Sequence, residues 1–539
     1  MAPDQLLSDY AAARLASRIW AREPSAFVGP TPGAAVNEAI LNRLGWLDAP
    51  ATMPARAAEI EGFRSKLATE GLTDIYLLGM GGSSLCAEVL RDVLGVRGHK
   101  NRLVVLDTTD EQAVRAAGEA LVPKRSLFLV ASKSGSTLEV TSLERYFWSL
   151  VSAAVPVAGA HFAAITDPGT SLVEHAARHQ YRHTFINPAD IGGRYSALSM
   201  FGLVPAAMVG ISGATLLAPA QEMAEACRLD SPTNPGLQLG IFMGAQARSG
   251  RDKLTILASP ALSPLGGWIE QLVAESTGKL GRGVLPVVGE PAGTALEYGP
   301  DRAFVAIRAE GDRETAAMAD ALEAAGHPVF RIETNTAALG AEFFRWEFAT
   351  AVAGAVLGLN PFDEPDVRSA KSRTQAQIDA RAATGSFRVD PPLEVGPLYA
   401  RRDSPAAGRP LPAHAYVAIL DYLPADPTRT DAINRLRAAL RSRLQVATTH
   451  GVGPRYLHST GQYHKGGPNT GLFVLVTSAD ATDTPIPGAG YSFSTLKHAQ
   501  ALGDFDALVG ADRTVIHCHF DTPAADVVTR LEHVLTTLL

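Results

Sequence analysis

The fold of this chain is decided by residues 74–94, which read DIYLLGMGGSSLCAEVLRDVL. A short apolar run at residues 75–78 leads into a glycine and serine turn at residues 79–84, and a helical pattern follows at once. A buried strand, a tight turn and a helix in this order form the repeating unit of parallel sheets that are covered by helices. This stretch therefore predicts an α/β protein.

Units of the same kind recur in two sets along the chain. The first set continues through RLVVLDTT, SLFLVASKSGS and HFAAITDP, ends near residue 165, and is followed by a long buried helix expected over residues 196–214. The second set starts at KLTILASP and continues through GVLPVVGEP, AFVAIRAE and PVFRIET, with helices expected over residues 313–325 and 340–357. We therefore expect two doubly wound parallel-sheet domains.

A third, smaller α/β segment is expected after a connection. Residues 363–412 are rich in charge, Pro, Ala and Gly, and beyond them YVAILDYL, GLFVLVTS and RTVIHCHF alternate with helical patterns. The predicted organisation is a helical extension at residues 1–50, domains at 51–225 and 226–375, a linker at 376–412 and the C-terminal α/β segment at 413–539.

Composition limits the classes of function. The 539 residues carry a net charge of −7, which argues against a nucleic-acid partner. No segment approaches the roughly 18 uninterrupted apolar residues of a membrane-spanning helix. The N-terminus has early acidic residues and lacks the pattern of a secretory signal, so we expect a cytoplasmic protein. The cysteines Cys86, Cys227 and Cys518 are far apart, which argues against a disulfide framework and a metal site.

Two loops at strand ends have the composition of an anion site. The turn at residues 79–84 is GMGGSS and the turn at residues 132–137 is SKSGST; each follows a buried strand and opens a helix. Glycines allow close backbone approach, the start of a helix offers unpaired N–H groups, and hydroxyls donate to phosphate oxygens. The spacing is not the G-x-G-x-x-G of a dinucleotide site, whereas a plain tight turn or a helix cap remains an alternative.

These two loops resemble the phosphate-binding pair of sugar-isomerase (SIS) domains, and three further motifs narrow the resemblance to the phosphoglucose isomerase family. The motifs are GGRYS at residues 192–196, QLVAESTGK at 271–279, and LGLNPFD at 357–363 continuing through Lys371. With the C-terminal run HSTGQYHKGGPNTG, the chain most resembles the isomerase portion of bifunctional transaldolase/phosphoglucose isomerases. A transaldolase barrel needs about 250 residues, for which the chain has no room beside the expected domains.

The resemblance implies two SIS domains and an aldose–ketose isomerase that interconverts glucose 6-phosphate and fructose 6-phosphate through an enediolate, with no cofactor. It implies that Glu275 is the base, that Arg194 stabilises the enediolate, and that Gln271 lies beside the base. It also implies a phosphate site, for which the matching residues are Gly82, Ser83, Ser132, Ser134 and Thr137, with Lys133 contributing mostly its backbone amide and positive potential.

Ring opening of the cyclic sugar is the step for which this sequence departs from the family. Lys371 matches the family's late lysine, but the residue seven positions earlier is Glu364, where the family usually carries Gln. The histidine that normally follows the catalytic Glu by a few tens of residues is missing. We hypothesise that His458, in the run HSTGQ of the third segment, takes its place.

Other interpretations remain open at this stage. Glu275 and Lys371 could be surface charges, Arg194 could be a structural arginine, and His458 could lie in a loop that binds a regulator or packs at an interface. The function could extend to phosphomannose isomerisation, or the chain could be a sugar-phosphate-binding regulator with inert SIS domains. By resemblance we expect a sugar phosphate as the small-molecule partner and a homodimer.

Overall fold

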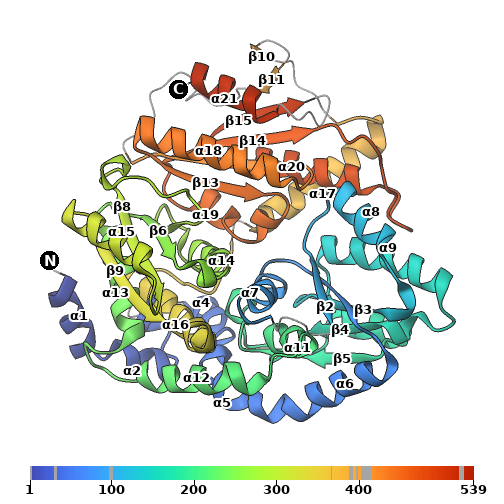
Figure 1. The fold of residues 1–539 in the computed structure, drawn as a ribbon, viewed down its shortest axis with the longest axis horizontal. Coiled ribbons are helices and arrows are strands. Elements are labelled where there is room, and N and C mark those ends of the chain that lie inside the picture. Colours follow the sequence, from blue (N-terminus) through green and yellow to red (C-terminus); the bar gives the residue numbers. More distant parts are fainter. Residues whose placement is uncertain are drawn as a thin grey trace.

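Three β-sheets organise the chain. The computed structural model describes residues 3–29, 33–95, 101–365, 367–387, 393–395, 398–401, 414–520 and 527–538. Figure 1 shows the first sheet and its helices on the right, the second on the left, and the C-terminal sheet above both. The predicted α/β class, with two parallel-sheet domains and a smaller C-terminal α/β segment, is confirmed.

The first sheet has five parallel strands in the order β2-β1-β3-β4-β5. Alternate residues of β1 enter different apolar clusters: Ile75 and Leu77 face one side of the sheet, and Tyr76 and Leu78 face the other. Both faces are therefore covered, as a doubly wound sheet requires. The strands are β1 (Asp74–Gly79), β2 (Arg102–Leu106), β3 (Ser126–Ala131), β4 (Phe162–Thr166) and β5 (His183–Ile186), and the helices are α6 (Ala57–Glu70), α7 (Leu85–Leu94), α8 (Glu111–Glu119), α9 (Leu138–Ala154) and α10 (Ser171–Arg178).

Two expectations for this first region were wrong. The strands do not end near residue 165, because β5 follows; its short sequence HTFI is only partly buried and lacks a clear apolar run. The long helix expected over residues 196–214 is two helices, α11 (Met200–Met208) and α12 (Gly213–Ala226). Gly210 adopts a φ of 84°, which ends the first helix, and the Ser212 side chain caps the second.

The second sheet has four parallel strands in the order β7-β6-β8-β9. Helix α16 (Leu339–Leu357) is buried along almost its whole length and packs against α12 and α13, so it lies at the centre of the main core. The strands are β6 (Lys253–Ala258), β7 (Leu285–Val287), β8 (Arg302–Ala309) and β9 (Val329–Thr334), and the other helices are α13 (Pro235–Arg248), α14 (Leu265–Thr277) and α15 (Arg313–Ala324).

The N-terminal segment packs on both regions. The indole of Trp20 stacks on Phe344 of α16 with ring centroids 6.0 Å apart, and Trp46 stacks on Tyr195 at 5.2 Å. The helices are α1 (Pro3–Ala12), α2 (Leu15–Trp20), α3 (Ser25–Val28), α4 (Ala34–Leu41) and α5 (Ala49–Thr52).

The third sheet has the order β10-β11-β15-β14-β12-β13, in which the last four strands are parallel. The short strands β10 and β11 pair antiparallel at one edge. The strands are β10 (Leu393–Val395), β11 (Leu398–Arg401), β12 (Tyr416–Tyr422), β13 (Ala447–Val452), β14 (Gly471–Ser478) and β15 (Thr514–Phe520), and the helices are α18 (Pro427–Leu444), α19 (Gly461–Gly466), α20 (Phe493–Gly510) and α21 (Val527–Leu538).

The range predicted as a linker contains secondary structure. Helix α17 (Val367–Thr384) extends into residues 376–384 and packs against α20, and β10 and β11 also lie in this range. The helix is polar, with Ile378 as a buried apolar residue, so its sequence resembles a connection. Residues 388–392, 396–397 and 402–413 lie outside the described part, and the division of the chain into five ranges remains a prediction.

The C-terminal segment contacts both of the other sheets' domains. The Thr109 hydroxyl donates to Gln500 Oε1 at 2.7 Å, and the fully buried Lys497 donates to Asp110 Oδ2 at 2.9 Å. On the other side, Arg437 donates to the carbonyl oxygen of Gly289 at 2.8 Å. These polar contacts fix the segment to both domains, and Figure 1 shows it above the two of them.

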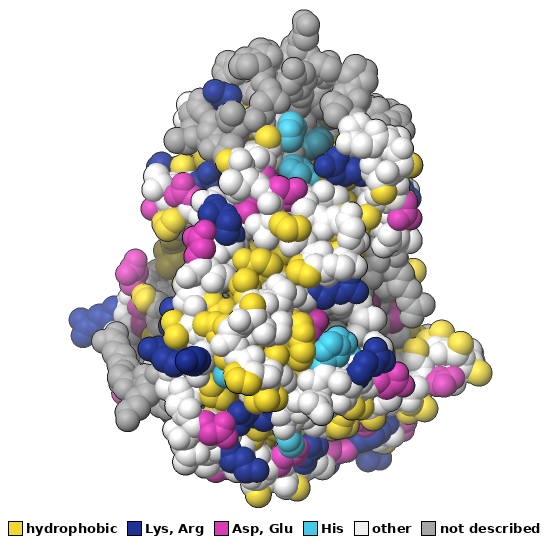
Figure 2. Space-filling model, turned by 90° about the vertical axis from the view of Figure 1, so that its right-hand side faces the viewer, with side chains coloured by type: hydrophobic (Ala, Val, Ile, Leu, Met, Phe, Trp, Pro, Cys, Tyr) yellow, Lys and Arg dark blue, Asp and Glu magenta, His cyan; other side chains and the backbone are white. Residues whose placement is uncertain are grey.

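Membrane-spanning helices and metal-binding clusters are absent from the described residues, and one face of the surface is shown in Figure 2. No helix within the described ranges is long and apolar enough to cross a membrane. Among the same residues, no group of three or more His, Cys, Asp and Glu could hold a metal ion. Figure 2 shows the face on the right of Figure 1, where hydrophobic side chains gather in the middle and charged side chains lie around them.

The buried His464 predicts a pH-dependent stability. Its ring is 1% exposed among Tyr416, Tyr456 and Phe473, and neither ring nitrogen has a hydrogen-bond partner among the described residues. Burial, with the charges of Lys465 and Arg513, holds the pKa of His464 well below its usual value. Below about pH 6.5 the unfolded chain binds a proton that the folded chain refuses, so stability falls as the pH falls.

We expect the His464→Phe variant to lose this dependence. The difference in unfolding free energy between the variant and the natural chain should grow by about 1.4 kcal/mol, in favour of the variant, between pH 7.5 and pH 5.5. Denaturant unfolding at the two pH values measures it. A difference that does not change with pH would contradict the assignment.

Candidate active site

The glycine and serine turn after β1 lies against the turn that carries Arg194. Gly81 has a φ of 54°, in the region that favours glycine. A Cβ on Gly82 would lie 1.9 Å from the carbonyl oxygen of Gly193, so these two turns touch backbone to backbone. The Ser83 side chain is buried in the same turn, which ends in the N-terminus of α7. Gly82 is therefore required for close approach.

The hydroxyl loop after β3 lies at the same edge of the sheet, because β1 and β3 are parallel neighbours with Gly79 opposite Ala131. Ser132 Oγ and Thr137 Oγ1 are 2.9 Å apart, and Ser134 Oγ accepts a hydrogen bond from the Ser136 amide at 3.3 Å. The two loops expected to bind phosphate are thus adjacent.

Two observations bear on the anion-site interpretation. The alternative of plain helix capping is not supported, since neither Ser84 at α7 nor Thr137 at α9 makes a side-chain cap hydrogen bond. The Lys133 ammonium instead pairs with Asp167 and donates to the carbonyl oxygen of Ala189 at 3.2 Å. The ammonium group of Lys133 is therefore already paired within the first domain.

Arg194 lies in the short helix η6 (Gly193–Tyr195) and is the centre of the candidate site. Its side chain is 4% exposed, and its Nε donates to Ser276 Oγ at 2.8 Å. Its Nη1 lies 3.4 Å from Glu275 Oε1 and donates to Glu364 Oε2 at 3.0 Å. One buried guanidinium therefore joins the GGRYS turn of the first domain to two carboxylates.

Glu275 and Gln271 lie one turn apart on α14, as the sequence spacing predicts. Gln271 Nε2 donates to Glu275 Oε2 at 3.2 Å and to the backbone oxygen of His458 at 2.8 Å. Burial raises the pKa of Glu275, while the charge of Arg194 opposes this effect. The side chain is thus a carboxylate of increased basicity, held by an amide and a guanidinium.

His458 reaches this region from the third segment. It ends the short helix η10 (Arg455–His458), whose Arg455 Nε lies 3.2 Å from Asp107 Oδ2 of the first domain. The ring nitrogen His458 Nε2 is 3.0 Å from Glu139 Oε1. Gln500 also donates to this Glu139 oxygen, at 2.7 Å. The third segment therefore brings a histidine to the Gln271–Glu275 pair.

Glu139 was not singled out in the sequence. It lies two residues after Thr137, in the first turn of α9, and its side chain is buried. A carboxylate that directly follows a hydroxyl loop is a local pattern that could have marked Glu139 as a candidate site residue. Its pairing with a histidine 319 residues later could not be read from the chain.

The late lysine is described only in part. Lys371 lies on α17, but its side chain is outside the described part of the structure.

The lysine of the QLVAESTGK motif has a different role: Lys279 Nζ donates to the carbonyl oxygen of Asn360 at 2.9 Å and to Asp363 Oδ1 at 2.7 Å. Burial lowers the pKa of Lys279 to about 8. Lys279 thus holds the loop that precedes α17.

The contact between the two turns predicts a large effect for one glycine substitution and little effect for another. In Gly82→Ala the new methyl group overlaps the Gly193 carbonyl, so the free energy of unfolding should fall by about 3 kcal/mol and activity should be lost. Gly193→Ala is the matched control, because a Cβ there meets no atom within 4 Å. Its stability should stay within about 0.5 kcal/mol of the natural chain in denaturant unfolding. Equal losses in the two variants would contradict the packing argument.

The chain is similar to known isomerases over much of its length. Residues 56–282 match the family model described as phosphoglucose isomerase. A glucose-6-phosphate isomerase of Rubrobacter xylanophilus is 28% identical over 403 residues, which cover 65% of this chain and 93% of that protein. One of Campylobacter jejuni is 32% identical over 213 residues, which cover 39% of this chain and 51% of that protein.

Solved structures support the same fold. A hypothetical protein from Thermus thermophilus superposes with a TM-score of 0.61 at 24% identity, covering 69% of this chain and 96% of that one. A glucose-6-phosphate isomerase from Chlamydia trachomatis superposes with a TM-score of 0.53 at 18% identity, covering 68% of this chain and 78% of that one. The site motifs at residues 192–196 and 271–279 lie inside the matched range. Residues 56–282 of this chain are thus similar to the phosphoglucose isomerase family.

Proposed function

We propose that this chain is a glucose-6-phosphate isomerase, which interconverts glucose 6-phosphate and fructose 6-phosphate through an enediolate. The observation that carries the proposal is a buried carboxylate beside a buried guanidinium, Glu275 and Arg194, 3.4 Å apart. They lie where the turn of Gly82 meets the GGRYS turn. The printed names of the relatives support the same reaction.

The chemistry needs one base and one cation. Transfer of a proton between C2 and C1 begins when a carboxylate removes the proton next to the carbonyl group, and the oxygen that gains negative charge must be stabilised. The raised pKa of Glu275, caused by burial, brings its basicity closer to neutral pH. Arg194 remains charged at any working pH and supplies the electrostatic stabilisation. Gln271 fixes the base through its amide.

The phosphate group is assigned to the two loops at the edge of the first sheet. The amides at the start of α7 and α9 face this edge without side-chain caps, and an anion there is stabilised by both helix dipoles. The hydroxyl and backbone donors assigned to it are those of Ser83, Ser132, Lys133, Ser134 and Thr137.

Substitution of the base tests the proposal. Glu275→Gln keeps the size of the side chain but replaces one carboxylate oxygen with an NH2 group, which removes the negative charge and the basic site. The isomerisation rate should therefore fall about a thousand-fold. The matched control is Glu270→Gln on the same helix, which should keep its activity. This carboxylate accepts a hydrogen bond from Ser459 Oγ at 3.4 Å, and its partial burial raises its pKa to about 7. A coupled assay of glucose 6-phosphate and fructose 6-phosphate measures both variants. Glu275→Gln with intact folding and full activity would rule out this base.

Ring opening is assigned to His458 and Lys371. A proton must reach the ring oxygen while another leaves the anomeric hydroxyl, and a histidine held by a carboxylate suits such a transfer. The His458–Glu139 distance of 3.0 Å and the buried position of Glu139 support this role. The assignment of Lys371 rests on its place in the motif.

The histidine is tested by comparing cyclic and open substrates. His458→Ala should slow turnover of glucose 6-phosphate about a hundred-fold, because the general acid is removed. Turnover of 5-deoxyfructose 6-phosphate, which lacks the hydroxyl that closes the ring, should change far less. Equal losses on both substrates, or no loss on either, would contradict a role in ring opening.

We also propose a relationship to bifunctional enzymes, a homodimer and a cytoplasmic location. The run HSTGQYHKGGPNTG supports a relationship to the isomerase portion of bifunctional transaldolase/phosphoglucose isomerases. SIS enzymes commonly pair subunits across the active site, which supports a homodimer, and the composition supports a cytoplasmic location. An assay with mannose 6-phosphate decides whether the enzyme also accepts the other configuration at C2.

A further inference from the structure

Two carboxylates share one nitrogen of the Arg194 guanidinium. Nη1 lies 3.4 Å from Glu275 Oε1 and 3.0 Å from Glu364 Oε2. The catalytic chemistry described above uses Arg194 and Glu275 but gives no role to Glu364. Glu364 is therefore an additional negative charge on the cation that pairs with the base.

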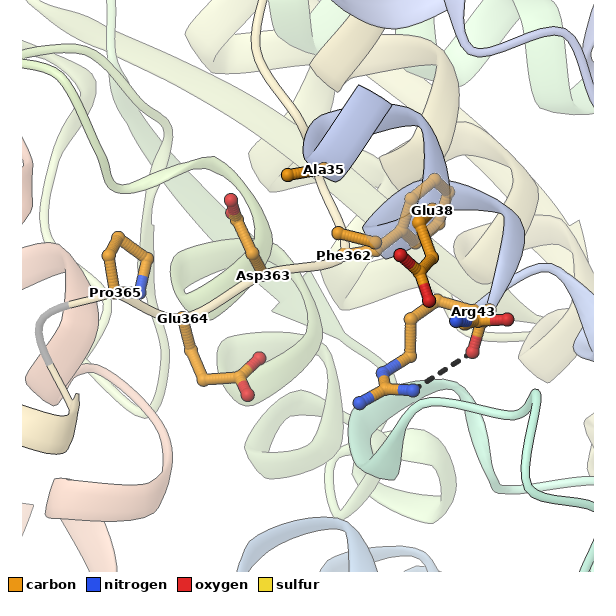
Figure 3. Close-up of a pocket in the computed structure, with 9 residues that line it drawn as sticks. Ala35, Glu38, Arg43, Phe362, Asp363, Glu364 and Pro365 are labelled. Atoms are coloured by element: carbon orange, nitrogen blue, oxygen red, sulfur yellow. Dashed lines mark hydrogen bonds between the residues drawn. The ribbon is translucent and has the colours of Figure 1, made fainter. Parts of the chain in front are cut away.

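Glu364 differs from Glu275 in its access to solvent. The Glu275 side chain is 12% exposed, whereas the Glu364 side chain is 40% exposed and lines a cavity of about 530 Å³. Figure 3 shows this cavity, with Glu364 on one wall. Glu38, which lies on α4, and Arg43, which follows α4, lie on another. Arg194 thus lies between a buried carboxylate and a carboxylate in contact with water.

The backbone around Glu364 is tied to the same cluster. Arg194 Nη2 donates to the carbonyl oxygens of Pro361 at 3.0 Å and Asp363 at 2.9 Å. Lys279 donates to Asp363 Oδ1 at 2.7 Å. Because the backbone just before Glu364 is bound to the same guanidinium as its side chain, the Glu364 carboxylate is held against Arg194.

The charges around Glu275 oppose one another. Besides burial, which raises its pKa most, the groups that act on it are Arg194, which lowers the pKa, Glu364, which raises it, and His458 and Gln271, which lower it. Glu364 itself stays ionised: burial opposes its charge, but the charge of Arg194 and the hydrogen bond from it outweigh this effect and lower its pKa. A permanent negative charge therefore offsets part of the field of Arg194 at the base.

We propose that Glu364 is a positioning residue for the isomerisation, which holds the Arg194 guanidinium from the solvent side and shares its charge with Glu275. This inference rests on the proposed isomerase activity. When Glu275 takes the proton from the sugar it becomes neutral and no longer attracts Arg194. Glu364 then remains as the charged partner that keeps the guanidinium in place while the enediolate carries its negative charge.

A second consequence concerns the strength of the base. A carboxylate next to an arginine with no other partner is a weak base, because the cation favours its ionised form. Sharing the guanidinium with Glu364 reduces this effect, so Glu275 accepts a proton more readily near neutral pH. The position of Glu364 thus combines a fixed cation with a competent base.

The test is the pH dependence of kcat/KM for Glu364→Gln. Loss of the charge should move the acid limb to lower pH by about half a unit or more. On the plateau, kcat should fall several-fold while KM changes little, since the phosphate site is elsewhere. Glu38→Gln is the matched control, because it removes a carboxylate from the same cavity without a contact to Arg194. Its pH profile should match that of the natural chain.

Glu364→Asp keeps the charge and provides a second variant if the glutamine variant does not fold; its acid limb should stay within about 0.2 unit of the natural position. Suppose that the natural enzyme is active. The inference about Glu364 alone would then be overturned if folded Glu364→Gln had the same acid limb as the natural enzyme. A large shift in Glu364→Asp, or an equal shift in Glu38→Gln, would overturn it too. A natural chain with no isomerase activity at any pH would instead overturn the proposed function.

Discussion

The buried guanidinium of Arg194 is the interaction on which the rest of the site depends. It binds Ser276 and Glu275 of α14 and the backbone oxygens of Pro361 and Asp363, so three segments from different parts of the chain meet on one planar cation. A buried charge is tolerated only when all sides of it are paired. The two domains therefore cannot move apart at this point without exposing unpaired charge, which fixes Glu275 relative to the GGRYS turn.

Local patterns predicted most of the elements that surround this cation. Strands such as β1 and β8 contain apolar runs because both faces of their sheets are covered. The spacing of Gln271 and Glu275 gave their common helix face directly. The missed elements have little apolar pattern of their own: β5 is partly exposed and α17 is polar, and each is stabilised by contacts with distant segments.

The candidate site divides in the same way. Motif residues could be named from the sequence because each lies in a short run with a distinctive composition. Their partners could not: Glu139 meets His458, Lys133 pairs with Asp167, and Gly82 packs on Gly193 only after the sheets have formed. Side-chain direction depends on the pairing of strands and domains, which spacing along the chain does not encode. The role of the Glu364 charge likewise became apparent only from its distance to Arg194.

The position of His458 on the same polypeptide as Glu275 has a consequence for the enzyme in solution. A catalytic group carried by the same chain stays at a fixed, high effective concentration near its partners, whereas a group supplied by a second molecule is lost as that molecule dissociates. The η10 helix is anchored to the first domain through Arg455 and Asp107. The His458 ring should therefore stay beside Glu139 when the protein is diluted.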